Sequence, residues 1–384
     1  MTEFKAAHAA GHDWQSACQA ALETLGRPAA QFTLGFVYVS ESIGGDFSQI
    51  HEALRAATGI RDWVGAVGFG VCGLSPGNGT GAPQDSAGGE YFGQAAIALL
   101  VCDLSREDYR IFHIGSDGLS GFHAEHDEWI AAARPAVAVV HGDSRDGRVP
   151  DLIGNMAADC NMFLVGGLAA FTSPRSLVAG TVSGGGISGV MLSSRVAVVS
   201  GVSQGSAPLG PLHRVTSAQG NVLLTLDGQP ALEALKQDIG FESESEFLRL
   251  AALVNIALLL PGSDTGDFVV RNLTGIDDKH GYVGVGDRVE PGGRIMFCSR
   301  DHDTAVKDLR RVVANTAERA GAAGKGALYF SCVARGPNLF GPNGEEVKLL
   351  LEGLGTMPLA GFYANGEISN DKLYGHTGVL VVFG

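Results

Sequence analysis

MPLAGFYANGEI (357–368) is an apolar strand candidate that ends at a glycine and leads directly into an acidic residue, Glu367. A strand candidate and a helix candidate precede it, ALYFSCVARG (327–336) and GEEVKLLLEGLG (344–355), and a return strand follows, HTGVLVVFG (376–384). Strands alternating with a helix of this length predict a parallel strand pair joined by a crossover, with the last strand returning antiparallel.

The same order of strand, helix, strand and return strand occurs twice more upstream. The first copy comprises FTLGFVYVS (32–40), FSQIHEALRAATG (47–59), WVGAVGFG (63–70) and AAIALLVC (95–102). The second copy comprises AVAVVHGD (136–143), VPDLIGNMAAD (149–159), MFLVGGLAA (162–170) and GISGVMLSS (186–194). We therefore expect an α/β fold of repeated strand-helix-strand-strand units that form mixed sheets flanked by helices.

The repeats also suggest how the chain divides. A further helix candidate precedes the first unit (13–26) and the third (301–321). This likeness suggests two related halves, with one domain over residues 1–235 and another over residues 236–384. No Pro-rich or Ser-rich linker separates them, so we expect the halves to pack closely.

Composition and charge narrow the class of protein. Of the 384 residues, 45% are hydrophobic and 18% are charged, which is typical of a packed globular protein. The net charge is −14 and no run of Lys or Arg occurs, so nucleic acid is not an expected partner. The six cysteines include no C-x-x-C pair, which favours free thiols over a zinc site or a disulfide framework.

Two features of the sequence predict the cellular compartment of the protein. The strongest apolar run, AALVNIALLL (251–260), has about half the length that a membrane-spanning helix needs. The N-terminus lacks the basic-then-apolar order of a secretory signal. We therefore expect a cytoplasmic protein without membrane insertion.

Polar side chains follow the two strands of the third unit. If these strands are parallel neighbours joined by a right-handed crossover, their C-terminal ends lie at one edge of the sheet, where ligands of open α/β sheets bind. Four side chains then emerge there together: Cys332, Arg335, Asn365 and Glu367. Structural interpretations remain open for three of them: a core thiol for Cys332, a salt bridge for Arg335 and a turn for Glu367.

Three other motifs lack the context that their chemistry needs. GFGVCG (68–73) matches a dinucleotide fingerprint, but a loop rather than a helix follows it. GVSQG (201–205) matches a serine-hydrolase elbow, but two prolines follow. HAEHDE (123–128) offers two histidines to a metal, with a solvated acidic surface as the alternative. His141 and Asp143, at the end of a strand, form either a turn or a ligand contact.

The motifs of the third unit resemble the C-terminal signature of the FIST family. SCVARGPNLFG, PLAGFYANGEI and LYGHTGVLVVF follow the order of that signature, and VSQGSAPLGPLHRVTSAQG resembles the end of the family's N-terminal domain. The family pattern maps onto Cys332, Arg335, Gly361, Gly366, Glu367, Gln204, Gly205, Pro208 and Gly210. The chain departs from the pattern at Ser206, where relatives often carry cysteine, and at Tyr374, which precedes His376. VGFGVCG in the first unit also lacks the acid equivalent to Glu367.

The resemblance implies an intracellular sensory module rather than an enzyme. Such domains bind a small molecule, with an amino acid or a carboxylate as the suggested class, and act on a separate signalling protein such as a histidine kinase. The ligand-binding residues that it implies are Cys332, Arg335, Asn365, Gly366, Glu367, Tyr374 and His376. We expect no metal and no cofactor at them.

Two alternative functions stay open. Some members of the family bind heme and respond to nitric oxide, and a non-covalent heme here would need an axial ligand such as His376, His141 or Cys332. An enzyme would need a nucleophile such as Cys332 or Cys72.

Overall fold

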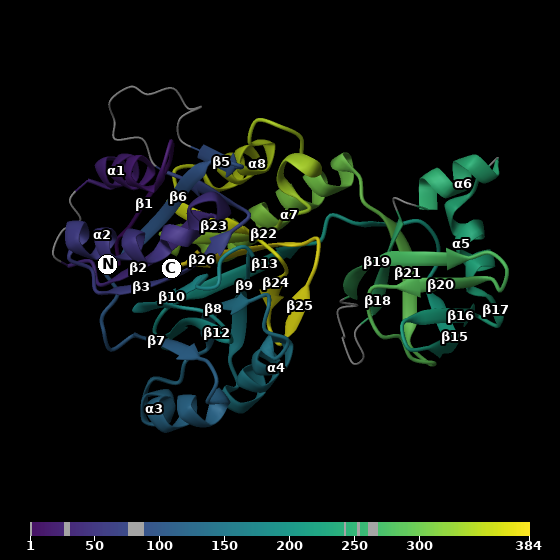
Figure 1. The fold of residues 1–384 in the computed structure, drawn as a ribbon, viewed down its shortest axis with the longest axis horizontal. Helices are drawn as coiled ribbons and strands as arrows, with labels where there is room; N and C mark the ends of the chain where they lie inside the picture. The colour runs from purple at the N-terminus through teal and green to yellow at the C-terminus, as the bar shows by residue number, and fades with distance from the viewer. Residues whose placement is uncertain (1, 27–30, 76–87, 242, 252–253, 260–267) are drawn as a thin grey trace. The chain divides into compact units, whose positions relative to one another are not determined.

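The computed structural model describes residues 2–26, 31–75, 88–241, 243–251, 254–259 and 268–384. The chain forms two compact units, whose helices and strands Figure 1 shows. The first unit combines residues 1–203 with residues 309–384, and the second comprises residues 204–308.

The first unit contains three sheets of six strands each. The first sheet has the order β1 (Phe4–Gly11), β6 (Ala95–Cys102), β2 (Leu34–Ser40), β3 (Asp62–Gly68), β10 (Leu177–Ala179) and β11 (Thr181–Ser183). The second has the order β7 (Tyr109–Ile114), β12 (Ile187–Leu192), β8 (Val137–Asp143), β9 (Phe163–Ala169), β24 (Glu367–Ser369) and β25 (Lys372–Tyr374). The third has the order β13 (Val198–Ser203), β26 (Gly378–Phe383), β22 (Gly326–Cys332), β23 (Leu359–Ala364), β4 (Gly70–Leu74) and β5 (Gly88–Phe92).

Each sheet contains one of the three predicted units, which confirms the repeated strand-helix-strand-strand order. Two parallel strands, β2 and β3, β8 and β9, or β22 and β23, lie side by side, and the return strand pairs antiparallel with the first of them. The helices that join the parallel pairs are α2 (Phe47–Thr58), α4 (Val149–Cys160) and α8 (Glu345–Leu354).

The structure does not show two related halves. What recurs is a unit present three times, and residues 204–308, which do not follow its pattern, interrupt the third copy between β13 and β22. Every copy also has a helix before its parallel pair: α1 (Trp14–Leu25), α3 (Gly118–Ala133) and α7 (His302–Ala320). Asp13 begins α1, because its carboxylate accepts a hydrogen bond from Ser16 N at 2.8 Å.

The three units exchange their hairpins in a cycle. The hairpin β10–β11 of the second unit completes the first sheet, and β24–β25 of the third unit completes the second sheet. The hairpin β4–β5 of the first unit completes the third sheet. Each sheet therefore needs residues from two units, so the units cannot fold as separate domains.

Three glycines mark corresponding positions in the units. Gly65, Gly166 and Gly361 each lie in the second parallel strand, in register with Val37, Val140 and Tyr329 of the first. A Cβ atom at each glycine would lie only 1.7, 1.8 or 2.1 Å from the carbonyl oxygen of its partner. The same close backbone approach therefore occurs three times, and the three glycines define which positions of the three sheets are equivalent.

The inner faces of the three sheets share one hydrophobic core, and helices cover the outer faces. Tyr38, His141 and Phe330 occupy corresponding positions and meet inside this core. Their ring centroids are 5.5 Å apart for Tyr38 and His141 and 6.0 Å apart for each other pair. The near-equal distances indicate an approximate threefold arrangement of the units around this cluster.

The second compact unit is a closed antiparallel barrel of six strands. Its strands in order are β21 (Arg294–Ser299), β15 (His213–Gln219), β16 (Val222–Leu226), β20 (Tyr282–Val285), β19 (Phe268–Asp277) and β18 (Val254–Leu259), and β18 pairs with β21. The short strands β14 (Ala207–Pro208) and β17 (Gln229–Pro230) pair with it, and its helices are α5 (Ala231–Ile239) and α6 (Glu244–Ala251). The predicted domain boundary at residue 235 falls within α5, so the compact units and the predicted domains divide the chain differently.

Residues of the Q-G-x-x-P-x-G motif stabilise the barrel. The backbone amides of Gln204 and Gly205 donate to Oδ2 of Asp308 at 2.8 and 3.0 Å. His213 lies between two carboxylates, with Nδ1 2.7 Å from Asp227 and Nε2 2.8 Å from Asp238. A Cβ atom at Gly210 would lie 2.1 Å from Cγ of Asp238, so the glycine leaves room for this carboxylate.

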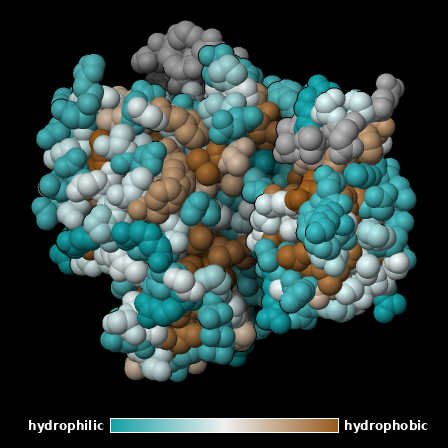
Figure 2. Space-filling view, turned by 45° about the vertical axis from the view of Figure 1, so that its right-hand side comes forward, coloured by the Kyte–Doolittle hydropathy of each residue, from teal (hydrophilic) through white to brown (hydrophobic). Residues whose placement is uncertain are grey.

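The described helices do not include one with the length and apolar character that crossing a membrane requires. On the face in Figure 2, hydrophilic residues predominate and hydrophobic residues reach the surface in smaller patches.

Candidate functional site

The predicted edge of the third sheet exists, but most of its polar side chains are buried. β22 and β23 are parallel, and Cys332 ends β22 with 7% of its surface exposed. Asn365, just after β23, is exposed. The chain then leaves the third sheet, because Asn365 N donates to the carbonyl of Leu168 in the second sheet. The structure thus separates Asn365 from the buried groups.

Gly366, Glu367, Tyr374 and His376 lie where the chain joins the second sheet. Glu367 in β24 pairs with Tyr374 in β25, and His376 follows at a positive φ of 64° in the turn before β26. Gly366 has a φ of 146°, which favours glycine. Tyr374 and His376 are half-buried.

Arg335 is fully buried and forms an ion pair with an acidic residue of α8. Its Nε donates to Oε1 of Glu346 at 2.8 Å, and its Nη atoms donate to the carbonyl and hydroxyl of Ser203 at 3.2 and 3.3 Å. Its guanidinium lies 4.9 Å from the ring centroid of Phe340. These contacts support the interpretation of Arg335 as a salt-bridge residue.

Glu346 is the hydrogen-bond centre of this region. Its carboxylate accepts from the Tyr329 hydroxyl at 2.7 Å, from the Ser331 hydroxyl at 2.9 Å and from Gly336 N at 2.9 Å, in addition to Arg335. Both Glu346 and Arg335 are 0% exposed. A buried ion pair with this many donors is satisfied, and removing either partner would leave an uncompensated charge.

Glu367 is a second fully buried carboxyl. Its Oε2 accepts from the backbone and side chain of Thr377 at 3.0 and 2.8 Å, whereas Oε1 forms no hydrogen bond of good geometry with a described residue. Burial raises the pKa of Glu367 to about 8, although the Thr377 donors, the charge of Arg335 and the thiol of Cys332 act in the opposite direction. Glu367 is therefore mainly protonated at pH 7.

Comparing the three sheets at matching positions shows that the outer face of the third sheet differs from the outer faces of the other two. The outer face of the third sheet carries Tyr329, Tyr363, Cys72 and Glu90. The same registers place Val37, Val67, Val178 and Val182 there in the first sheet, and Val140, Leu168, Ile368 and Leu373 in the second. Two sheets therefore pack aliphatic residues under their helices, and the third packs polar ones.

We call Cys72, Glu90, Tyr329, Ser331, Arg335, Glu346 and Tyr363 the polar cluster. Burying such groups costs free energy that aliphatic side chains do not cost, and the other two units show that the fold does not need them. A polar departure from an otherwise repeated core is expected at a functional site rather than a structural one.

A cavity of about 640 Å³ lies beside the polar cluster. Its walls come from β5, from the loop after β22 and from the first turns of α8, which lie close together in Figure 1. The lining residues that matter here are Glu90, Phe92, Pro337, Gly344, Val347, Lys348 and Leu351. It thus lies at the predicted edge of the sheet, although the exposed Asn365 does not line it.

Glu90 is the acidic group of the cavity wall. Both its oxygens are buried, and neither they nor the Tyr363 hydroxyl form a hydrogen bond of good geometry with a described residue. Burial raises the pKa of Glu90 to about 8, and the charge of Glu346 adds to this effect. Tyr363 and the Val347 amide lie close enough to lower the pKa in part. Glu90 is therefore a buried carboxyl without a strong partner.

Sequence reasoning missed Glu90, Glu346, Tyr329 and Tyr363, and it considered Cys72 only as a nucleophile. A signal for the two tyrosines was present, because aligning the three units position by position places them where the other two units have valine or leucine. Glu90 and Cys72 carried no such signal, because their hairpin belongs to the first unit in sequence and reaches the third sheet only through the exchange of hairpins.

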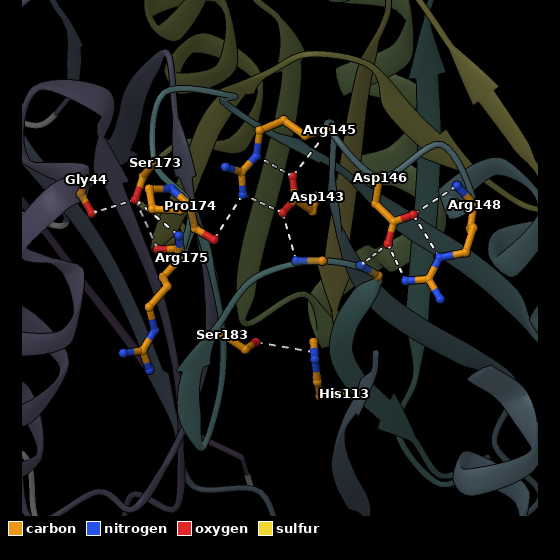
Figure 3. Close-up of polar contacts among 12 residues, drawn as sticks. Gly44, His113, Asp143, Arg145, Asp146, Arg148, Ser173, Pro174, Arg175 and Ser183 are labelled. Carbon is orange, nitrogen blue, oxygen red and sulfur yellow. Dashed lines mark hydrogen bonds and ion pairs between the residues drawn. The ribbon is translucent and has the colours of Figure 1, made fainter. Parts of the chain in front are cut away.

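The corresponding edge of the second sheet is closed by its own chain (Figure 3). Asp143 holds Arg145 through two hydrogen bonds of 3.0 and 2.7 Å and accepts from Gly185 N at 2.8 Å. Asp146 holds Arg148 in the same way, at 2.9 and 2.6 Å, and these bonds lower its pKa. The aspartates are thus occupied by arginines and loop amides, which supports the turn interpretation of Asp143.

Of the groups that the resemblance offers for heme, His141 does not fit, and His376 and Cys332 lie outside the cavity. His141 is fully buried with Nε2 3.2 Å from the Tyr38 hydroxyl, and aromatic rings of Tyr38, Phe330 and Phe362 surround it at 5.5 to 6.0 Å. A porphyrin has no room there. Burial also lowers the pKa of His141 to about 3. The described lining of the cavity contains neither histidine nor cysteine, so His376 and Cys332 do not reach it.

The fold and the cavity define an α/β protein of three interlocked repeats, interrupted by a barrel, with a small-molecule-sized cavity at the third sheet. The chain belongs to the FIST family: the model of the FIST N domain matches residues 33–229, and that of the FIST C domain matches residues 231–370. An uncharacterized protein of Mycobacterium tuberculosis is 37% identical over 195 residues, which are 48% of this chain and 50% of that protein. An uncharacterized protein of Mycobacterium bovis is 36% identical over 192 residues, 47% of this chain and 49% of that protein. The matched segments thus span about half the length of these relatives.

Proposed function

We propose that this protein is a sensory protein that binds a small ligand in the cavity at the third sheet and acts on a separate output partner. The observation that carries this proposal is the replacement of an aliphatic core by the polar cluster at one of three otherwise matching sheets. The cavity beside the cluster has the volume of ordinary small-molecule sites, and its lining combines apolar side chains with the polar groups of Glu90, Gln94, Asn343 and Lys348.

The cysteines support a role without catalysis. Cys72 is fully buried, and burial followed by the charges of Glu90 and Glu346 raises its pKa well above the ordinary value. A thiol that stays protonated is a poor nucleophile. Cys332 is also buried, at 7% exposure, and does not line the cavity.

A signalling role requires that ligand binding alters a surface that the partner contacts. The loop after β22 contributes to the cavity wall through Pro337 and Pro342, and Pro342 and Asn343 are exposed. This loop is a route from the cavity to the surface, and a kinase of the histidine type is the partner class that the family suggests.

A thermal-shift screen over amino acids, small carboxylates, amines and heme tests the proposal. A compound that binds the native state raises the melting temperature by mass action. Leu351→Trp should fill the cavity from α8 and abolish the shift. Leu22→Trp, a half-buried leucine in a different groove between α1 and α2, is the matched control and should leave the shift unchanged. A shift that survives Leu351→Trp would place the ligand elsewhere, and no shift with any compound would count against a sensory role.

A further inference from the structure

The polar cluster holds more carboxyl groups than cations. Glu90 and Glu346 are both acidic, and Arg335 is the only cation among the seven residues of the cluster. Arg335 is committed to Glu346 at 2.8 Å, and its second buried acidic neighbour is Glu367. Glu90 therefore has no cation of its own within the cluster.

Lys348 on the cavity wall does not supply the missing charge. Its Nζ lies 2.9 Å from Oε1 of Glu345 on the same helix, and its side chain is 52% exposed. The remaining walls near Glu90 include apolar side chains of β5, the loop and α8, namely Phe92, Pro337, Val347 and Leu351. The cavity thus presents one buried carboxyl next to these apolar side chains, and Gln94, Asn343 and Lys348 complete the polar part of its lining.

Building on the proposed ligand-binding function, we propose that the ligand is a small organic cation, whose ammonium group pairs with Glu90 while its carbon chain lies against the apolar wall. An ammonium group would give the buried carboxylate the charge-assisted hydrogen bonds that it lacks. It would also reach the Tyr363 hydroxyl, which is fully buried and has no hydrogen-bond partner of good geometry among the described residues.

Binding of such a cation must release a proton. Glu90 is mainly protonated below its pKa of about 8, whereas a primary amine stays charged up to about pH 10. The amine therefore exchanges with the proton of Glu90, and its affinity should rise by up to about tenfold per pH unit between pH 6 and 8. The other titratable or charged groups that face Glu90 are Cys72, Tyr363, Glu345, Glu346 and, on the cavity wall, Lys348.

Calorimetric titration of the full chain with matched compounds tests this inference. The panel contains primary alkylamines from methylamine to hexylamine and 1,4-diaminobutane, each with the alcohol and the carboxylate of the same length. At least one amine should bind ten times more tightly than its uncharged and anionic counterparts. Glu90→Gln should weaken that binding at least tenfold and abolish its pH dependence.

The control is the same substitution at a carboxylate of α8 that does not line the cavity. Glu352 is an exposed carboxylate of α8 that pairs with Arg310, and Glu352→Gln should change the affinity less than twofold. Melting curves of both variants show whether they fold. Tight binding of an alcohol or carboxylate, or full amine binding by Glu90→Gln, would overturn the cation assignment and leave the ligand-binding function standing. Failure of every panel compound, with a hit of another kind in the thermal-shift screen, would also overturn only the cation assignment.

Discussion

Arg335 and Glu346 show how burial changes the role of a residue at a sheet edge. From the sequence Arg335 is suited to form a salt bridge or, as the alternative, to clamp an anionic ligand, because only its position at the end of a strand is known. In the structure Arg335 is fully buried within the loop after β22, and its Nε donates to Glu346 at 2.8 Å. The residue that is left to meet a ligand is Glu90, which has no such partner.

Replacing Arg335 should therefore impair stability rather than ligand contact. Arg335→Ala leaves Glu346 buried with three neutral donors and no cation, and we expect a loss of about 3 to 5 kcal/mol in the free energy of unfolding. Urea denaturation monitored by circular dichroism measures this loss. A variant as stable as the parent would mean that the pair is not buried as described.

Glu367 should make stability depend on pH. Its pKa is about 8 in the folded protein against an ordinary value of 4.5, so the folded state retains a proton that the unfolded state loses. The stability from this proton is fully present below pH 4.5 and is lost as the pH rises through about 8.

Glu367→Gln removes that dependence, because the amide has no proton to lose. The free energy of unfolding of the parent, measured relative to that of Glu367→Gln, should fall with a slope of up to about 1.4 kcal/mol per pH unit between pH 5 and 8. Parallel denaturation curves over this range report the slope. Identical slopes for both proteins would show that Glu367 is already ionised.

At the scale of elements, the parallel strand pairs depend on the three glycines at corresponding positions. Alanine at Gly65, Gly166 or Gly361 would drive a Cβ atom into a backbone carbonyl oxygen that cannot move without breaking the sheet. Each substitution should cost about 3 kcal/mol or more. Gly154 is the control, since it lies within α4 with nothing within 4 Å of its Cβ position, and Gly154→Ala should stabilise the protein by about 0.5 to 1 kcal/mol. Equal effects of all four substitutions, measured by thermal unfolding, would contradict the correspondence of the units.

In the barrel, His213 joins the start of β15 to the turn after β16 and to α5. Burial lowers the pKa of His213, but its hydrogen bonds to Asp238 and Asp227 outweigh burial and raise the pKa above 6.5. The stability that the protonated ring contributes is therefore fully present below about pH 6.5 and is lost as the pH rises through the folded-state pKa. In NMR titrations, Asp238→Asn should lower the pKa of His213, and Gly210→Ala should do the same by displacing Asp238. An unchanged pKa in both variants would exclude the two-carboxylate arrangement.

At the scale of the whole molecule, the barrel is an insertion with its own core. Its first residues and its last are joined by the hydrogen bonds from Gln204 and Gly205 to Asp308, and its core residues come from residues 204–308 alone. A fragment of residues 204–308 should therefore fold by itself and give a dispersed NMR spectrum with a cooperative unfolding transition. A fragment without tertiary structure would show that the barrel depends on the rest of the chain.

The sequence was sufficient to predict the three repeated units, because each has long apolar strands around an amphipathic helix. It did not reveal the exchange of hairpins, since strands of three residues such as β10 and β24 carry too short a pattern and pair with strands far away in the chain. The position of Arg335 and Glu367 near one sheet edge followed from the parallel crossover. Their burial did not follow, because nothing in the local sequence tells which loop covers an edge, and Glu90 is joined to them only by that exchange.

We propose that ligand binding is confined to the third of the three matching sheets, and hydrogen–deuterium exchange tests this proposal most directly. The full chain is compared with and without the first compound that raises its melting temperature, and the two other sheets with their helices serve as internal controls. We predict slower exchange in peptides that cover residues 88–94 and 336–351, with no change in the corresponding peptides of β11 and α2 or of β25 and α4. Protection of those corresponding peptides, or of the barrel, with none at 88–94 and 336–351, would contradict the account.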